Sequence, residues 1–197
     1  GSNGGGLVFD GTNDYAIVSS SNFQSGNNPF TMEAWFKLNN TPVWNIIFAY
    51  GQDTGGQAKA AILYIDTSLQ PVFEFGSLSG KVTGSIIQLN QWYHVVATYD
   101  KSYTRMYLNG TLLNSTSFSS ANVSLDNGVN GQNAGIGCFF SGQGNVTSPQ
   151  RYGSFNGNIP IARHYNRALS ASEVLQNYNA NKARFASSSL SISKVPR

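Results

Sequence analysis

The sequence is poor in cysteine, in charge and in long apolar stretches, and each scarcity excludes a class of protein. The single cysteine, Cys138, excludes an intrachain disulfide and a cysteine-based zinc cluster, and its apolar neighbours predict a buried core residue. No stretch approaches the roughly 20 apolar residues of a membrane-spanning helix, so we expect no membrane insertion. Charged residues make up only 11% of the 197 positions, and Asn, Ser, Thr, Gln and Gly carry the polarity instead. This polarity suits neutral, hydroxyl-rich ligands.

The basic residues are concentrated at one end of the chain. The formal net charge is +3, but the last seventeen residues hold four of the 12 Lys and Arg residues, namely Lys182, Arg184, Lys194 and Arg197. The other eight basic residues are matched by nine acidic ones, so the body of the chain is close to neutral. Binding to a phosphate backbone needs a clustered basic surface. We therefore expect no nucleic-acid partner.

Short alternating runs of apolar and polar residues, separated by Gly, Asn, Ser and Asp, predict an all-β sandwich or barrel. The expected strands are 7–9, 15–19, 30–38, 44–50, 60–65, 72–75, 81–87, 92–99, 104–108, 111–118, 135–139 and 157–165. In 30–38 the even-numbered residues are apolar, which predicts that one face of this strand belongs to the core. Asn109-Gly110 supplies the two positive-φ positions of a type I′ turn, so a hairpin is expected there.

One helix is expected, late in the chain. Ser170 supplies an N-cap and Glu173 completes an S-x-x-E capping box, while Val174, Leu175 and Tyr178 share one face. This pattern predicts a short helix over 171–181 that covers a sheet edge or one end of the sandwich.

The length fits one domain, which we place at 7–185, because single all-β domains reach about 200 to 250 residues. Residues 1–6 begin with Gly1-Ser2 and are typical of a cleavage scar and leader, and 186–197 are typical of a linker.

Five blocks resemble the laminin G-like, concanavalin A-like jelly-roll family. The blocks are Leu7-Val-Phe-Asp-Gly-Thr-Asn-Asp-Tyr15, Phe30-Thr-Met-Glu-Ala-Trp35, Trp92-Tyr-His-Val-Val-Ala-Thr-Tyr-Asp100, Arg105-Met-Tyr-Leu-Asn-Gly110 and Tyr165-Asn-Arg-Ala-Leu-Ser-Ala-Ser-Glu173. The resemblance implies two antiparallel sheets packed face to face, in a recognition module attached to a larger assembly. The last block, continued to Phe185, is similar to copies of this domain in phage and large-virus structural proteins, which implies a virion surface or an extracellular location.

One departure from the family bears on calcium. Where the family tends to have an acidic residue after its last Gly-x-Ile, this sequence has Pro160, which offers no carboxylate. The other oxygen-rich clusters, around Asp10 with Asp14, Asp53 and Asp126, hold one or two acids each, whereas calcium takes six to eight oxygens. We interpret them as turns and expect no cofactor; if calcium binds, Asp10 and Asp14 are the expected ligands.

The residues needed for catalysis on a sugar chain are scarce. The strand-borne glutamates, Glu33 and Glu74, lie in different expected strands, without the paired carboxylates that glycosidases use. His94 and His164 are the candidate bases for a lyase, but a histidine with apolar neighbours on a strand is more often structural. The sequence therefore favours a protein that is not an enzyme.

Aromatic residues in polar loops indicate carbohydrate binding, because a ring face stacks on a sugar while amides bind its hydroxyls. The residues of this kind are Trp44, Asn45, Tyr103, Phe140, Gln143, Asn145, Arg151 and Tyr152. Trp44 could equally belong to the core, and Trp35 and Trp92 are interpreted as structural.

These patterns together predict a non-catalytic module that binds a glycan or host-surface polysaccharide on a viral tail, fibre or capsid surface. Two alternatives stay open. One is a purely structural domain that contacts other virion or fibre subunits, and the other is a polysaccharide lyase or hydrolase.

Overall fold

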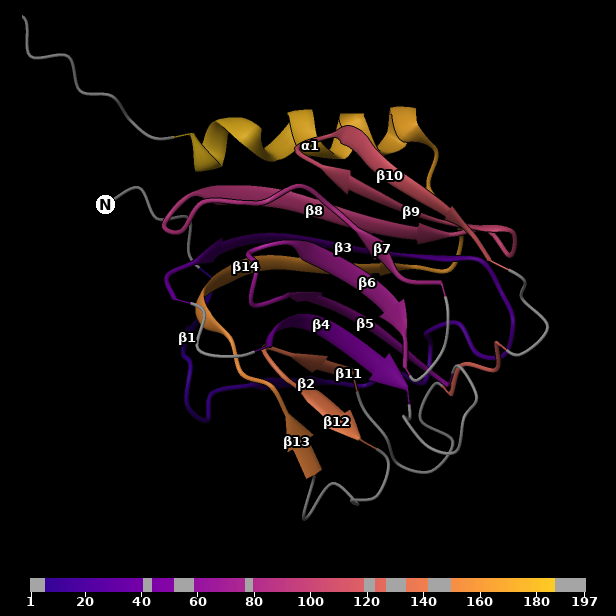
Figure 1. Cartoon of the computed structure of the whole chain (residues 1–197), viewed down its shortest axis with the longest axis horizontal. Coiled ribbons are helices and arrows are strands. Elements are labelled where there is room, and N and C mark those ends of the chain that lie inside the picture. The colour runs from indigo at the N-terminus through magenta and orange to yellow at the C-terminus, as the bar shows by residue number, and fades with distance from the viewer. Residues whose placement is uncertain are drawn as a thin grey trace, which may run out of the picture.

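The computed structural model describes residues 6–40, 44–51, 59–76, 80–118, 123–126, 134–141 and 150–186, without the side chains of 141 and 150–152. Two six-stranded antiparallel sheets pack face to face, as the jelly-roll resemblance implies (Figure 1). Sheet A consists, in spatial order, of β1 (Leu7–Asp10), β14 (Asn156–Tyr165), β3 (Phe30–Leu38), β8 (Trp92–Tyr99), β9 (Tyr103–Leu108) and β10 (Thr111–Ser117). Sheet B consists of β2 (Ala16–Val18), β11 (Ala134–Ile136), β4 (Asn45–Gly51), β5 (Ala60–Ile65), β6 (Pro71–Phe75) and β7 (Val82–Thr83).

The main core lies between the two sheets and follows the predicted alternation. The even-numbered residues of β3, from Phe30 to Leu38, all belong to this core cluster, and Cys138 is also fully buried. The odd-numbered residues Thr31, Glu33 and Trp35 are buried as well, although they point to the other face of sheet A. A second layer must therefore cover that outer face.

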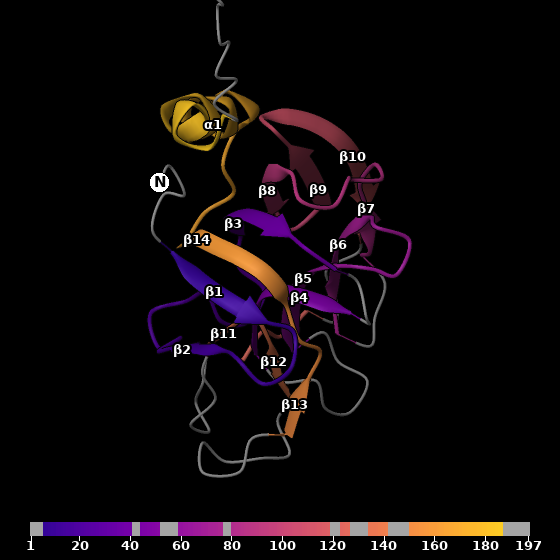
Figure 2. The ribbon, with the colours of Figure 1, turned by 90° about the vertical axis from the view of Figure 1, so that its left-hand side faces the viewer.

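The second layer is helix α1 (Ala171–Phe185), which lies along the outer face of sheet A (Figures 1 and 2). Ser170 and Glu173 form the predicted capping box. The prediction was wrong on two points. The helix ends four residues beyond 181, and it covers a sheet face instead of an edge or a sandwich end. Both differences have one cause, because Phe185 packs on Trp35 of β3 and Trp92 of β8, and these contacts stabilise a further helical turn.

The hairpin at Asn109-Gly110 is confirmed, with φ angles of 51° and 81°.

The strand predicted over 81–87 is wrong, since β7 covers only two residues. The next pair would place Gly84 opposite Pro71, which has no N–H to continue the ladder. A further antiparallel strand pair, β12 (Phe139–Ser141) with β13 (Gln150–Tyr152), lies largely between the strands expected over 135–139 and 157–165, where no strand was predicted. Within the described residues, no helix is long and apolar enough to cross a membrane.

Candidate functional site

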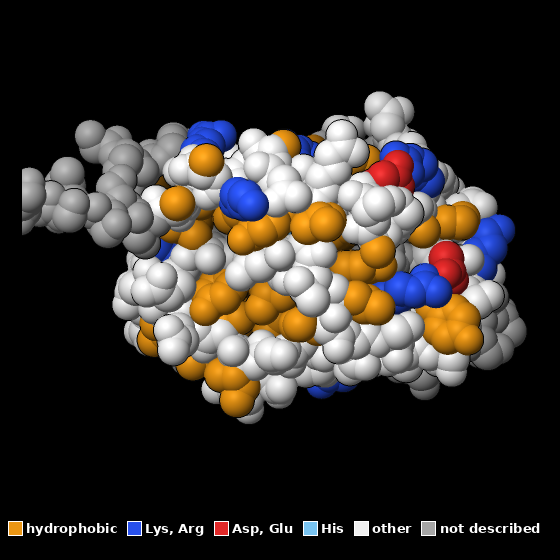
Figure 3. Space-filling view, turned by 90° about the horizontal axis from the view of Figure 1, so that it is seen from above, with side chains coloured by type: hydrophobic (Ala, Val, Ile, Leu, Met, Phe, Trp, Pro, Cys, Tyr) orange, Lys and Arg blue, Asp and Glu red, His pale blue; other side chains and the backbone are white. Residues whose placement is uncertain are grey.

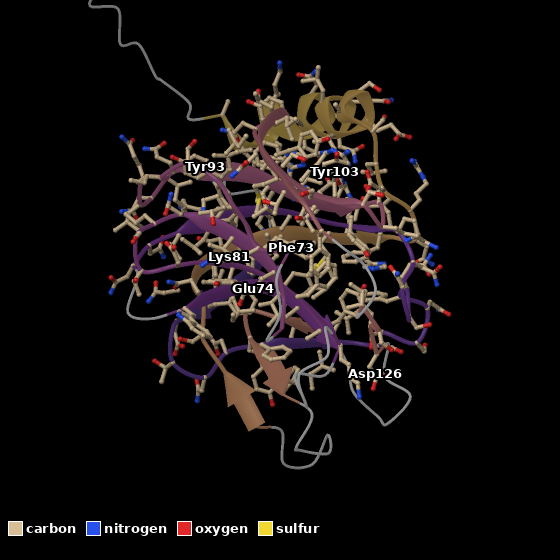
Figure 4. The ribbon with its side chains drawn as sticks, turned by 45° about the vertical axis from the view of Figure 1, so that its right-hand side comes forward. Phe73, Glu74, Lys81, Tyr93, Tyr103 and Asp126 are labelled. Atoms are coloured by element: carbon tan, nitrogen blue, oxygen red, sulfur yellow. The ribbon has the colours of Figure 1, made fainter. Side chains whose placement is uncertain are left out.

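The two exposed aromatic residues predicted to bind a glycan lie at opposite ends of the sandwich. Tyr103, 43% exposed, begins β9 beside the end of sheet A where Phe30 pairs with Tyr99. Trp44, 55% exposed, lies beyond the other end of β3 and stacks at a tilt on Tyr64, with ring centroids 5.8 Å apart. Figure 4 shows the full length of sheet A between Tyr93 at one end and Tyr103 at the other. One ligand site cannot include both Trp44 and Tyr103 without spanning the whole domain.

The other predicted glycan-binding residues do not complete a site around Trp44. Asn45 is fully buried and Phe140 is 7% exposed, so burial argues against direct ligand contact by either side chain. Arg151 and Tyr152 pair with Phe140 and Phe139 through the backbone of β13, and their side chains lie outside the described part. Gln143 and Asn145 also lie outside the described residues. Trp44 alone of this group remains a candidate in the described structure.

The carboxylates of Asp10 and Asp14 are engaged in a turn. Asp10 Oδ1 accepts hydrogen bonds from the backbone N–H groups of Thr12 at 2.7 Å and Asn13 at 3.4 Å, and Asp14 Oδ2 accepts from the Asp10 N–H at 3.0 Å. The bonds to Asp10 are those of an Asx-type turn, and the bond to Asp14 ties the end of the loop back to its start. Of the other oxygen-rich clusters, Asp53 lies outside the described residues, and Asp126 is half-buried. The expectation of no cofactor, with Asp10 and Asp14 as the ligands if calcium binds, stays a prediction.

Glu33 is the centre of a buried polar network beneath α1. Its Oε1 accepts a 2.7 Å hydrogen bond from Arg163 and lies 3.2 Å from His94 Nε2. Its Oε2 accepts from the Tyr165 hydroxyl at 2.9 Å and from Asn177 of α1 at 2.8 Å. Burial raises the pKa of Glu33, but His94, Arg163 and Tyr165 together hold it below its ordinary value of 4.5.

This network fixes α1 on sheet A and leaves Glu33 and His94 unsuited to catalysis. Both side chains are completely buried, so a polysaccharide cannot reach them in this structure. The other candidate base, His164, stacks on Phe23 with ring centroids 4.1 Å apart. Burial lowers the pKa of His164 to about 4, against a weaker opposing hydrogen bond that the imidazole donates to Asn166, so His164 is neutral near pH 7.

A pocket of about 360 Å³ opens where the C-terminal end of α1 meets sheet A. It is lined by Trp35, Trp92, Asn109, Tyr178, Lys182, Ala183, Phe185 and Ala186, and we call it the helix pocket. Its volume falls within the range of roughly 300–1,000 Å³ that is common for small-molecule sites. Figure 3 looks onto this side of the molecule and shows hydrophobic side chains gathered along its middle.

The aromatic wall of the helix pocket is assembled from three elements. Tyr178 and Phe185 are seven residues apart on α1, so their rings are separated by two helical turns, or about 10 Å. The Trp35 ring lies nearly parallel to both, with centroids 5.7 Å from Tyr178 and 4.4 Å from Phe185. The Trp35 ring therefore inserts between them. The Trp92 ring also packs on Phe185, with centroids 4.9 Å apart.

The polar atoms of the helix pocket are mainly hydrogen-bond donors. Trp35 Nε1 is buried and has no hydrogen-bond partner among the described residues. Asn109 Oδ1 accepts a 3.0 Å bond from the His94 backbone N–H, which leaves the Asn109 amide N–H₂ for other partners. Lys182 lies 5.8 Å from the Tyr178 ring centroid. Aromatic faces with free donors can hold a polar ligand that also has an apolar face.

Sequence reasoning missed this pocket because it treated Trp35 and Trp92 as structural and ended the helix at 181. One signal was present. Tyr178, Lys182 and Phe185 follow each other at helical spacings of four and three, which places an aromatic, basic stripe on one face.

Comparison with known families decides what kind of domain carries this pocket. A family profile described as "Concanavalin A-like lectin/glucanases superfamily" matches residues 10–175, which is most of the chain. The chain belongs to this superfamily. No curated protein matches it.

Solved structures of the same fold include several that are similar to the chain at low identity. A heptameric SAP-like pentraxin from Limulus polyphemus superposes with a TM-score of 0.62 at 15% identity, over 88% of this chain and 81% of the pentraxin. The CBM40 module of a Ruminococcus gnavus IT-sialidase, bound to α2,3-sialyllactose, gives 0.65 at 16%, over 88% of this chain and 95% of the module. The NanB sialidase of Streptococcus pneumoniae gives 0.65 at 15%, over 87% of this chain but only 27% of the sialidase. At these identities the similarity to the solved structures shows only that the fold is shared.

Proposed function

We propose that this superfamily member is a non-catalytic carbohydrate-binding domain whose glycan site is the helix pocket. The observation that carries the proposal is the pocket itself, in which Trp92 and Tyr178 present aromatic surface beside the Asn109 amide and the Lys182 ammonium group. Sugar rings pair an apolar face with hydroxyl groups, so this combination suits them. The CBM40 neighbour supports the carbohydrate-binding role, since that domain has the same fold and is bound to α2,3-sialyllactose in its structure.

The absence of suitable carboxylates supports a binding role over hydrolysis. Glycosidases position two carboxyl groups about 5 to 9.5 Å apart across the scissile bond. None of the described residues that line the helix pocket carries a carboxylate, and the nearby Glu33 is buried and hydrogen-bonded on both oxygens. The residues around the pocket can therefore hold a sugar but cannot supply the acid and base of hydrolysis.

Display on a virion, as a tail, fibre or capsid-surface module, remains part of the proposal and rests on the block from Tyr165 to Phe185. Many copies would be useful there. A shallow polar site leaves little free energy after ordering and desolvation, so we expect dissociation constants on the order of millimolar to tens of micromolar. Repetition on a particle then raises the effective affinity.

An assembly role is the second candidate, and a specific surface favours it. The strands β1 and β2 are edge strands of sheet A and sheet B, and they carry Leu7, Val8 and Ile17, which are 44%, 68% and 45% exposed. Apolar side chains along two sheet edges are typical of a subunit contact. Light scattering of the isolated chain tests this role. Assembly through these edges predicts an oligomer for the parent chain and a monomer for the Val8→Lys variant.

The test of the carbohydrate proposal is a glycan array probed with the multimerised protein. Trp92→Ala should abolish binding while the circular dichroism spectrum stays that of a β protein. The matched control is Tyr103→Ala, which removes an exposed aromatic residue at the opposite end of sheet A and should leave binding intact. If Tyr103→Ala abolished glycan binding and Trp92→Ala retained it, the glycan site would not be the helix pocket. Release of reducing ends or unsaturated sugars from a polysaccharide panel would overturn the non-catalytic claim.

A further inference from the structure

The helix pocket has a marked imbalance between donors and acceptors. The polar groups of its lining side chains are the indole N–H groups of Trp35 and Trp92, the amide of Asn109, the hydroxyl of Tyr178 and the ammonium of Lys182. Of these, only the Tyr178 hydroxyl and the second lone pair of the Asn109 oxygen, which already accepts from the His94 backbone N–H, can accept a hydrogen bond. A ligand rich in acceptors fits such a lining better than one that must donate.

The charges around the helix pocket favour an anion. Lys182 lines it and forms no ion pair with any described residue, and Lys37 stands 5.3 Å from the centroid of the Trp92 ring at the same end. The buried Glu33 is held by Arg163, Tyr165 and Asn177, so it does not oppose these lysines as a free carboxylate. Figure 3 shows that the acidic side chains visible on this side gather at the end where α1 begins, away from the end that forms the pocket.

One feature opposes an anion. The pocket lies at the C-terminus of α1, where the unpaired backbone carbonyls carry about half a negative charge. Lys182 lies in the last turn and brings a full positive charge, with Lys37 beside it. The net field at the pocket is therefore positive, and the carbonyls remain able to accept hydrogen bonds from sugar hydroxyls.

We propose that the helix pocket selects a sugar residue that bears a carboxylate, such as a hexuronate or a nonulosonate, over the matching neutral sugar. The inference rests on the proposed carbohydrate-binding function. The carboxylate pairs with Lys182 and accepts hydrogen bonds from the partly exposed Trp92 and Asn109 side chains, and the sugar ring occupies the aromatic wall.

The experiment is a titration of the chain with methyl β-D-glucuronide and, in parallel, methyl β-D-glucoside, which differs only in the carboxylate. The methyl glycoside of N-acetylneuraminate forms a third arm that separates the two kinds of acidic sugar. Binding is followed by calorimetry at low and at high ionic strength. At low ionic strength at least one acidic sugar should bind about fivefold or more tightly than the glucoside, and added salt should shrink the difference.

Charge variants assign the preference to the pocket. Lys182→Met should remove most of the preference for the acidic sugar, and Lys182→Arg should keep it. Lys81→Met is the matched control, because Lys81 is an exposed lysine beside β7 in the other sheet, away from α1 (Figure 4). Equal binding of acidic and neutral sugars overturns the selectivity and leaves the carbohydrate function standing. Failure of all three sugars, with neutral glycans bound on the array, also overturns the selectivity, whereas an array without any bound glycan overturns the function itself.

Discussion

The rings of Trp35 in β3 and Phe185 in α1 stack with their centroids 4.4 Å apart. In the sequence, Trp35 lies in the first quarter of the domain and Phe185 is its last residue. This contact holds the last turn of the helix on sheet A and closes one wall of the helix pocket. Stability and the proposed ligand binding therefore depend on the same pair.

Phe185→Ala should destabilise the protein, because it empties a buried aromatic site at the helix end. We expect a loss of about 3 kcal/mol in the free energy of unfolding, measured by urea denaturation. Leu175→Ala on the same helix is the control, since Leu175 is 46% exposed and should cost less than about 1 kcal/mol. Equal losses for the two variants would contradict the packing described for Phe185.

Gly110 is required by the approach of α1 to the β9–β10 turn. A Cβ at Gly110 would lie 3.0 Å from Leu175 Cδ1 and 3.1 Å from Tyr178 Cδ1, and its φ is 81°. Gly26 has a φ of 62° with no atom near a Cβ, so Gly26→Ala measures the backbone cost alone, about 1 kcal/mol. Gly110→Ala should lower the melting temperature more than Gly26→Ala does. The same shift for both would mean that the helix tolerates the extra methyl group.

His164 should make stability fall as the solution is acidified. Its pKa is about 4 in the folded chain against the ordinary histidine value of 6.5, so the unfolded chain binds the proton first. The stability present above pH 6.5 is therefore lost progressively as the pH falls to about 4, by up to about 3 kcal/mol. Glu33, whose folded pKa is lowered, adds a further loss below pH 4.5.

The variant His164→Phe keeps a ring against Phe23 and removes the titrating group. Thermal melts across this pH range should show a flatter profile for the variant than for the parent chain. A parent profile that is already flat between pH 6.5 and 4 would show that His164 is protonated freely in the folded state.

Calcium should leave the melting temperature unchanged, because the turn around Asp10 and Asp14 already uses both carboxylates. A ligand that binds only the folded state at a hundredfold excess over its dissociation constant stabilises it by about 2.7 kcal/mol, so a real site is easily detected. The comparison is between chelator and millimolar calcium. A clear rise that disappears in Asp14→Asn would establish the site.

Local chemistry explains what the sequence could predict. The Asn109-Gly110 turn and the Ser170–Glu173 capping box each depend on residues a few positions apart, and both are present. The alternation in β3 likewise identified the core face. It did not reveal that the other face is buried too, because only the docked helix shows this.

The site depended on relationships that no single segment contains. Trp44 and Tyr103 look alike as loop aromatics, and only the pairing of the strands shows that they lie at opposite ends. Trp35 and Phe185 meet because α1 folds back across sheet A, and the resulting pocket includes two tryptophans that were interpreted as structural. A turn or a cap can be predicted from neighbouring residues, whereas a pocket between three elements cannot.

Nuclear magnetic resonance of the indole N–H groups tests the central claim most directly. The chain has three tryptophans, so Trp35, Trp44 and Trp92 each give one signal, assigned with single Trp→Phe variants. Titration with a soluble form of the strongest-binding glycan from the array should shift the signals of Trp35 and Trp92 and leave that of Trp44 in place. A shift confined to Trp44 would contradict the account, because the glycan would then bind at the other candidate surface and not in the helix pocket.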